Sequence, residues 1–138
     1  LQNSLGLSSL PRIIECFDVS NLGKEHVVAG MVRFVYGKPD KSNYRRFRIK
    51  SVSGQDDFAS MNEAVFRRYR RLCDEKQLMP DLVIVDGGAG QVAAASSALD
   101  KLGLTLPLIG LAKEHEEIYL PDRDVPLRFD ADCRMMLL

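Results

Sequence analysis

The sequence predicts a mixed α/β fold in which three antiparallel strands are followed by parallel strands, with helices flanking the sheet. Three apolar runs with short connections open the chain, as in an antiparallel meander. Two amphipathic segments with apolar residues at helical spacing then alternate with short, fully apolar runs, which is typical of parallel strands covered by helices. The expected strands are 12–20, 26–36, 42–52, 82–85, 106–111 and a short one at 118–120; the expected helices are 58–76 and 91–102.

Composition indicates one soluble domain of ordinary character. The chain has 138 residues, of which 46% are hydrophobic and 28% charged, enough to bury a core in a single domain. No apolar run approaches the roughly 20 residues of a membrane-spanning helix, and residues 1–6 lack the features of a signal peptide. We therefore expect a cytoplasmic protein with no membrane association.

Cysteine usage and net charge narrow the function classes further. The cysteines Cys16, Cys73 and Cys133 are far apart and form no C-x-x-C pair, which indicates reduced thiols rather than a zinc site or a disulfide framework. Nineteen basic and nineteen acidic residues cancel. Any nucleic-acid binding must therefore depend on local basic clusters.

The ends of the chain predict its domain boundaries. Residues 1–11 are polar, contain glycine and serine and end at Pro11, as in a linker from an upstream module. The chain ends within the apolar segment 132–138, which begins like a helix. We expect one domain over 12–138 that is truncated at its C-terminal end.

The central feature is an apolar run that ends at a carboxylate and then at glycines. Leu82–Val85 is too short for a helix and reads as a strand buried on both faces. It delivers Asp86 to the carboxyl edge of the sheet, where α/β proteins keep their ligands. The glycines that follow, Gly87, Gly88 and Gly90, would let a phosphate backbone approach closely.

This turn allows three interpretations. The segment 88–93 fits the G-x-G-x-x-A form of a dinucleotide-binding turn, but Asp86 would repel the pyrophosphate unless a cation lay between them. With a divalent cation, Asp86 becomes a hard oxygen ligand. Alternatively, Asp86 caps the following helix.

The first strand carries a second acid. Asp18 lies near the end of the apolar run 12–20, where an ionised carboxylate needs a partner if it is buried. Either nearby groups such as Ser20 and Asn21 bond to it, or it is a metal ligand or catalytic group.

Two basic clusters follow. Along the strand 42–52, alternate residues place Tyr44 and a row of cations on one face, with Arg45 among the residues of the other. In the helix 58–76, Arg67, Arg70 and Arg71 lie largely off the apolar stripe. Each cluster is either a solvated surface or a phosphate-contacting one. The row on the strand is Tyr44, Arg46, Arg48 and Lys50, and the stripe is Phe58, Met61, Val65, Tyr69 and Leu72.

This order of elements is the ribonuclease-H-like plan, in which the first strand lies beside the strand 82–85. That pairing brings Asp18 and Asp86 together. Two adjacent carboxylates repel each other unless a cation bridges them, so a divalent metal is the expected occupant. A metal in this position can promote phosphodiester hydrolysis.

Five segments in the same order resemble one family. They are 15–21 (ECFDVSN), 38–47 (KPDKSNYRRF), 57–61 (DFASM), 81–88 (DLVIVDGG) and 109–114 (IGLAKE). They are similar to the C-terminal endonuclease domain of UvrC, the C component of the nucleotide excision repair excinuclease.

The resemblance implies a ribonuclease-H-like domain that makes the 5′ incision beside a DNA lesion. Asp18 and Asp86 match its catalytic, metal-binding acids, and the implied cofactor is Mg²⁺ or Mn²⁺. The implied partners are damaged double-stranded DNA and the B component of the excinuclease with lesion-bound DNA, with the A component acting upstream. Tyr44, Arg45, Arg46 and Lys113 match motif positions and are expected to contact DNA.

Two departures from the family pattern favour an alternative. Ala89 stands where the family usually has lysine. The family's third catalytic residue, a histidine, lies beyond residue 138, and neither His26 nor His115 matches its position. The fragment is therefore expected to be inactive by itself, and the alternative function is a catalytically incomplete nucleic-acid-binding module of the same fold.

Overall fold

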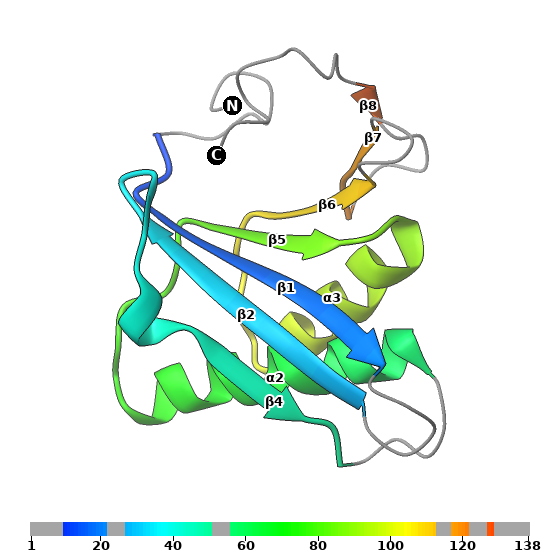
Figure 1. Cartoon of the computed structure of the whole chain (residues 1–138), viewed down its shortest axis with the longest axis horizontal. Coiled ribbons are helices and arrows are strands. Elements are labelled where there is room, and N and C mark those ends of the chain that lie inside the picture. Colours follow the sequence, from blue (N-terminus) through cyan, green and yellow to red (C-terminus); the bar gives the residue numbers. More distant parts are fainter. Residues whose placement is uncertain (1–9, 22–26, 51–55, 113–116, 122–126, 129–138) are drawn as a thin grey trace.

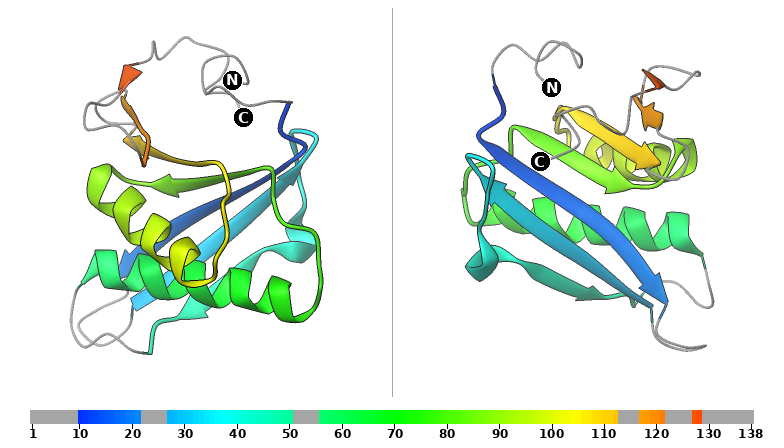
Figure 2. Two further views of the ribbon diagram at one scale, coloured as in Figure 1. Left: turned by 180° about the vertical axis from the view of Figure 1, so that it is seen from behind. Right: turned by 45° about the horizontal axis from the view of Figure 1, so that its top comes forward.

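A computed structural model describes residues 10–21, 27–50, 56–112, 117–121 and 127–128. Within these residues the chain forms one mixed sheet of eight strands, with two helices packed on one of its faces (Figures 1 and 2). Most of the expected linker and the helix expected at 132–138 lie outside the described residues, as do Lys113, His26, His115 and Cys133.

The first part of the sheet is antiparallel, as expected. Strand β1 (Ile13–Asn21) pairs with β2 (Val27–Val35) along its full length, and β2 pairs on its other edge with β3 (Lys38–Pro39) and β4 (Arg45–Arg48). The prediction of one continuous strand over 42–52 was wrong.

A short 3₁₀ helix, η1 (Lys41–Asn43), interrupts that segment. Its cause is local: the Asp40 carboxylate accepts hydrogen bonds from Asn43 Nδ2 at 2.8 Å and from Ser42 Oγ at 3.3 Å. Such side-chain bonds compete with the strand ladder, so pairing resumes only at Arg45.

The second part of the sheet is mainly parallel. Strand β5 (Leu82–Asp86) lies between β1 and β6 (Leu108–Ala112) and is parallel to both. Strand β7 (Glu117–Tyr119) then pairs antiparallel with β6, and β8 (Leu127–Arg128), which was not expected, with β7. The predicted adjacency of the first strand and the strand before Asp86 is confirmed.

Helices α2 (Asp57–Asp74) and α3 (Ala89–Lys101) pack side by side against the same face of the sheet (Figure 2). The Asp56 carboxylate caps α2 by accepting from the backbone N–H of Ala59 at 3.0 Å. Neither described helix is long and apolar enough to cross a membrane.

The two faces of the sheet bury different residues because side chains alternate along each strand. Phe17, Met31, Val83 and Val85 face the helices and form one core with them, whereas a smaller apolar cluster occupies the opposite face. Its buried members are Ile14, Leu82, Ile84, Ile109 and Ile118. We call the face that packs against α2 and α3 the helix face, and the opposite face, which carries the smaller cluster, the open face.

Candidate active site

The acids Asp18 and Asp86 lie on adjacent parallel strands. The register of β1 and β5 pairs Cys16 with Ile84 and Phe17 with Val85. Asp18 and Asp86 directly follow the Phe17–Val85 pair on their two strands, so they lie at the same level of the sheet. Alternation places both with Cys16 and Ile84 on the open face, on strands spaced about 4.8 Å apart. Both side chains are exposed to solvent.

The exposure of Asp18 corrects the argument that first singled it out. A carboxylate in an apolar strand was expected to be costly to bury, but Asp18 is exposed because the open face is uncovered at its position among the described residues. The buried acid of this strand is Glu15, which points to the opposite face and accepts a hydrogen bond from Arg68.

A row of residues crosses the open face from Asp18. Asp18 pairs with Gly30 on β2, and Gly30 pairs with Arg46 on β4, so the three lie side by side across three strands. A Cβ atom added at Gly30 would meet no atom within 4 Å. The surface between the carboxylate and the guanidinium-bearing residue is therefore flat enough for a ligand backbone to approach.

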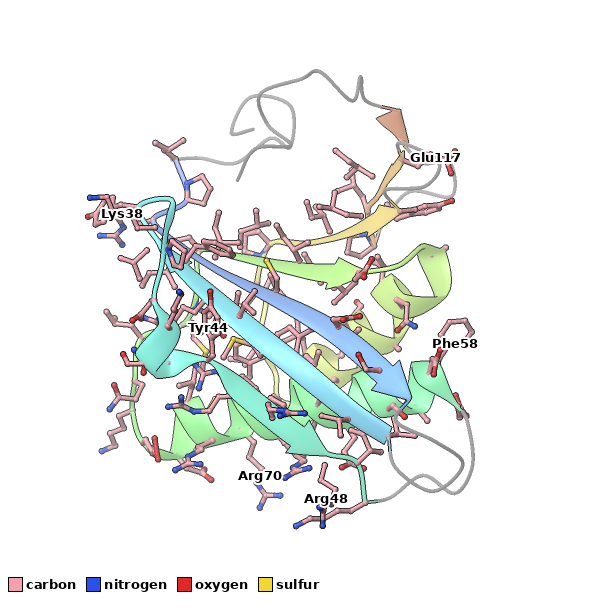
Figure 3. All side chains as sticks on the ribbon, in the orientation of Figure 1. Lys38, Tyr44, Arg48, Phe58, Arg70 and Glu117 are labelled. Carbon is pink, nitrogen blue, oxygen red and sulfur yellow. The ribbon has the colours of Figure 1, made fainter. Side chains whose placement is uncertain are left out.

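The basic residues of β4 are divided between the two faces. Arg46 and Arg48 are exposed on the side of Asp18, as the alternation predicted. Arg45 pairs with Met31, a helix-face core residue, and its Nη1 donates to the carbonyl of Tyr44 at 2.9 Å. Tyr44 is half-buried and directly follows η1. Figure 3 labels its side chain beside this 3₁₀ helix.

The arginines of α2 have partners within the domain. Arg67 Nη1 donates to the carbonyl of Arg48 at 2.8 Å and to Glu63 Oε2 at 3.1 Å, with its guanidinium 5.4 Å from the Phe47 ring centroid. The guanidinium of Arg70 lies over the Phe66 ring, 5.9 Å from its centroid. Arg71 Nε forms an ion pair with Glu75 Oε2 at 3.1 Å.

Because α2 covers the helix face, the cationic residues of the helix do not form one surface with Arg46 and the two aspartates. Arg48 and Arg70 lie near the same lower edge of the molecule in Figure 3, but they belong to different layers, the sheet and the helix.

The glycines after Asp86 are each close to a side chain of this chain. A Cβ at Gly88 would lie 3.4 Å from the Tyr119 ring, and one at Gly90 would lie 2.4 Å from the Phe58 ring. Gly87 has a φ of +148°, which disfavours any residue with a Cβ. Backbone conformation therefore accounts for Gly87 and the Phe58 ring for Gly90, whereas a Cβ at Gly88 would make only an ordinary contact with Tyr119.

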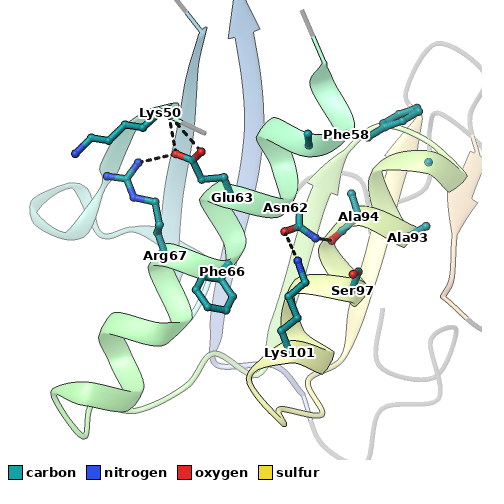
Figure 4. A pocket seen from close by; sticks show the side chains of 12 residues that line it. Lys50, Phe58, Asn62, Glu63, Phe66, Arg67, Ala93, Ala94, Ser97 and Lys101 are labelled. Atoms are coloured by element: carbon teal, nitrogen blue, oxygen red, sulfur yellow. Dashed lines mark hydrogen bonds and ion pairs between the residues drawn. The ribbon is translucent and has the colours of Figure 1, made fainter. Parts of the chain in front are cut away.

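Phe58 was expected on the buried stripe of α2, yet 56% of it is exposed. Its ring instead faces Gly90, at one end of a hollow of about 970 Å³ between α2 and α3 (Figure 4). Asn62 joins the helices there, donating to the Ala94 carbonyl at 2.9 Å and accepting from Lys101 Nζ at 3.4 Å. Neither Asp18 nor Asp86 lines this hollow.

A buried cluster of charged residues, which was not predicted from the sequence, lies on the helix face between the sheet and α2. Glu15 is fully buried and accepts from Arg68 Nη2 at 2.8 Å, Arg33 Nη1 at 3.0 Å and Tyr69 Oη at 2.9 Å. Burial, and then the charge of Glu15, raise the pKa of Tyr69 well above its usual value. The available signal was an acid between the apolar residues Ile14 and Cys16.

The donor set fits part of a magnesium or manganese site. Carboxylate oxygens are the ligands that these hard cations prefer, and Mg²⁺ is commonly held by one or two carboxylates together with substrate phosphates and water. Among the described residues no third histidine, cysteine or acid completes a cluster with the two aspartates. The two acids thus suit a site that the substrate itself helps to form.

The dinucleotide-binding interpretation does not fit this architecture. A dinucleotide fold places its glycine turn after the first strand of a parallel sheet. Here the turn at Gly88 follows β5, and the sheet begins with antiparallel strands. The rings of Tyr119 and Phe58 also occupy the space beside the turn.

The fold is that of the ribonuclease-H-like nucleases. Two solved structures with the same architecture are endonuclease V from Ciona intestinalis, in complex with DNA containing an inosine, and human ENDOV; both give a TM-score of 0.53. They are 21% and 18% identical in sequence and cover 75% and 72% of this chain, which in turn covers 46% and 44% of theirs.

Residues 2–138 match the family described as the UvrC RNAse H endonuclease domain, and the chain belongs to this family. Among relatives named UvrABC system protein C, that of Methanococcus maripaludis is 55% identical over 92% of this chain, and that of Methanospirillum hungatei is 51% identical over all of it. The chain spans about a quarter of their length, 24% and 26% respectively.

Proposed function

We propose that this domain is a metal-dependent DNA endonuclease that makes the 5′ incision beside a lesion during nucleotide excision repair. The observation that carries the proposal is the placement of Asp18 and Asp86 on one face of adjacent parallel strands, both exposed. Membership of the UvrC endonuclease family supports the assignment of the reaction.

Each residue of the open face has a role in this proposal. Asp18 and Asp86 hold Mg²⁺ or Mn²⁺, which when bound promotes attack by water and offsets the charge on the leaving oxygen. Gly30 leaves room for the phosphate backbone beside Asp18. Arg46, across Gly30, neutralises phosphate charge and orients the strand.

The proposed partners follow from the family. They are damaged double-stranded DNA and the B component of the excinuclease with lesion-bound DNA, with the A component upstream in a cytoplasmic pathway. Tyr44, Arg45, Arg67, Arg70, Arg71 and Lys113 are further proposed DNA contacts. The close backbone approach expected at Gly87, Gly88 and Gly90 is left out of the proposal, because the side chains of Gln91, Tyr119 and Phe58 lie against these glycines.

The test is Asp86→Asn in the full-length protein. We expect 5′ incision to fall by roughly 100-fold or more, the range for removing a group that stabilises developing charge in an active site. The thermal unfolding midpoint should stay within about 2 °C of wild type because Asp86 is exposed. Incision at the normal rate in this variant would refute the nuclease assignment.

A titration of Mn²⁺ into the present chain separates the nuclease from a module that only binds nucleic acid. With DNA present, calorimetry should detect binding in wild type and lose it in both Asp18→Asn and Asp86→Asn. Wild type that binds DNA but no Mn²⁺ would favour the catalytically incomplete module instead.

A further inference from the structure

A second cavity, distinct from the hollow between α2 and α3, lies on the helix face beside the C-terminal end of α2. Most of the residues that line it are polar or charged. It has a volume of about 350 Å³, which is large enough for a phosphate group and part of the molecule that carries it. Its walls come from β2, η1, β4, α2 and the turn after α2. Among the described residues that line it are the four arginines Arg33, Arg45, Arg68 and Arg71.

Local structure brings these walls together. The helix ends in a Schellman turn, with Lys76 at φ +53° and the N–H groups of Lys76 and Gln77 donating to the carbonyls of Cys73 and Leu72. This turn makes Gln77 and Leu78 part of the wall. It also satisfies two carbonyls at the helix end that would otherwise repel an anion.

The hydrogen bonds of the arginines leave donors for a ligand. A guanidinium has five N–H groups. Arg68 gives two of them to the buried Glu15, and Arg71 gives its Nε–H to Glu75. Arg45 donates only to backbone carbonyls, those of Ser42 and Tyr44, among the described residues.

Arg33 supports the same conclusion. Its Nη1 donates to Glu15, but its buried Nε makes no well-aligned hydrogen bond within the described part of the chain, although Asp40 Oδ2 lies 3.1 Å away. Arg33 and Arg68 are needed to neutralise Glu15, whereas Arg45 and Arg71 do not contact it. Four cations around this cavity face three acids, Glu15, Asp40 and Glu75, so positive charge is in excess.

We propose that this cavity binds a phosphate group, held between Arg45 and Arg71 with Arg33 and Arg68 at its base. Planar guanidinium groups pair with phosphate oxygens two at a time, which suits a site built from several arginines. The cavity lies on the opposite face of the sheet from Asp18 and Asp86. The phosphate belongs either to a free anion or to a nucleic-acid strand, and the experiment distinguishes the two sources.

The experiment titrates inorganic phosphate into the chain and follows the arginine Nε–H signals by NMR. The test variant is Arg45→Gln/Arg71→Gln, and the matched control is Arg46→Gln/Arg70→Gln. Both change the same charge at adjacent positions, but Arg46 and Arg70 do not line the cavity. We expect saturable shifts at Arg33 and Arg68 in wild type and control, with affinity at least about tenfold weaker in the test variant.

Equal affinity in both double variants, or shifts spread over all exposed arginines, would overturn the proposal. Competition by a short single-stranded oligonucleotide would assign the site to nucleic-acid phosphate, and failure to compete would assign it to a free anion. Arg45 and Arg71 are also proposed DNA contacts, but neither result depends on the aspartates, so failure of this proposal is distinguishable from failure of the proposed metal site.

Discussion

Two acids three positions apart on β1 have opposite environments. Glu15 points to the helix face, is fully buried, and accepts hydrogen bonds from two arginines and a tyrosine. Asp18 points to the open face and is exposed, beside Gly30 and in register with the end of β5. Both looked alike in the sequence, as acids in an apolar run.

The difference separates a structural acid from a candidate catalytic acid. A buried carboxylate with all its oxygens bonded holds α2, β1 and β2 together and has no capacity for a ligand. An exposed carboxylate beside a second one contributes little to stability and is accessible to a cation and a substrate. Variants at matched positions on the two faces test this division.

The largest effect on stability is expected from Glu15→Gln. Removing the charge leaves the guanidinium of Arg68 buried without its counterion, which should lower the free energy of unfolding by about 3–5 kcal/mol. Urea denaturation measures the change. The matched variant Asp18→Asn should change it by no more than about 1 kcal/mol, the range for an interaction of an exposed carboxylate, and equal losses in the two would contradict the division.

A smaller loss is expected from Tyr69→Phe. It removes a hydrogen bond to the charged Glu15, so at pH 7 the free energy of unfolding should fall by about 1.5–3 kcal/mol. The difference in stability between wild type and Tyr69→Phe should become smaller at alkaline pH. The pKa of Tyr69 is raised in the folded protein, so above pH about 10 the unfolded chain releases this proton while the folded protein keeps it.

Wild type therefore loses stability progressively as the pH rises above about 10 and approaches the folded pKa, and Tyr69→Phe lacks this part of the decline. Urea midpoints measured for both proteins from pH 7 to about pH 11 provide the check. A difference between them that stays constant over this range would show that Tyr69 ionises equally in both states.

The smallest effects compare two glycines. A Cβ at Gly110 on the helix face would lie 2.5 Å from Val92 Cγ2 and 2.7 Å from the carbonyl of Gly87, so Gly110→Ala should cost about 1–3 kcal/mol. Gly30→Ala on the open face meets nothing within 4 Å and should instead stabilise the chain by about 0.4–1 kcal/mol. Thermal unfolding of both variants measures this, and a destabilised Gly30→Ala would show that the open face is covered there.

Much of the architecture could be predicted from the sequence. Apolar periodicity located the two helices and the strands β1, β2, β5, β6 and β7 to within a few residues, and the order of elements predicted the neighbouring strands that carry Asp18 and Asp86. The prediction was wrong for 42–52, where the Asp40 side chain forms η1, and for Phe58, which is exposed.

By itself, therefore, the sequence determined the class of fold, the family motifs and the placement of both aspartates on neighbouring strands, Asp86 at the end of its strand and Asp18 within its own, because these depend on local periodicity and chain order. Only the tertiary structure decided that Glu15 is the buried acid, that Arg68 rather than Arg67 enters the core, and that the face carrying Arg45 is the one the helices cover. The physical reason is that burial and pairing depend on which face a neighbouring element covers, and residues distant in the chain supply that cover.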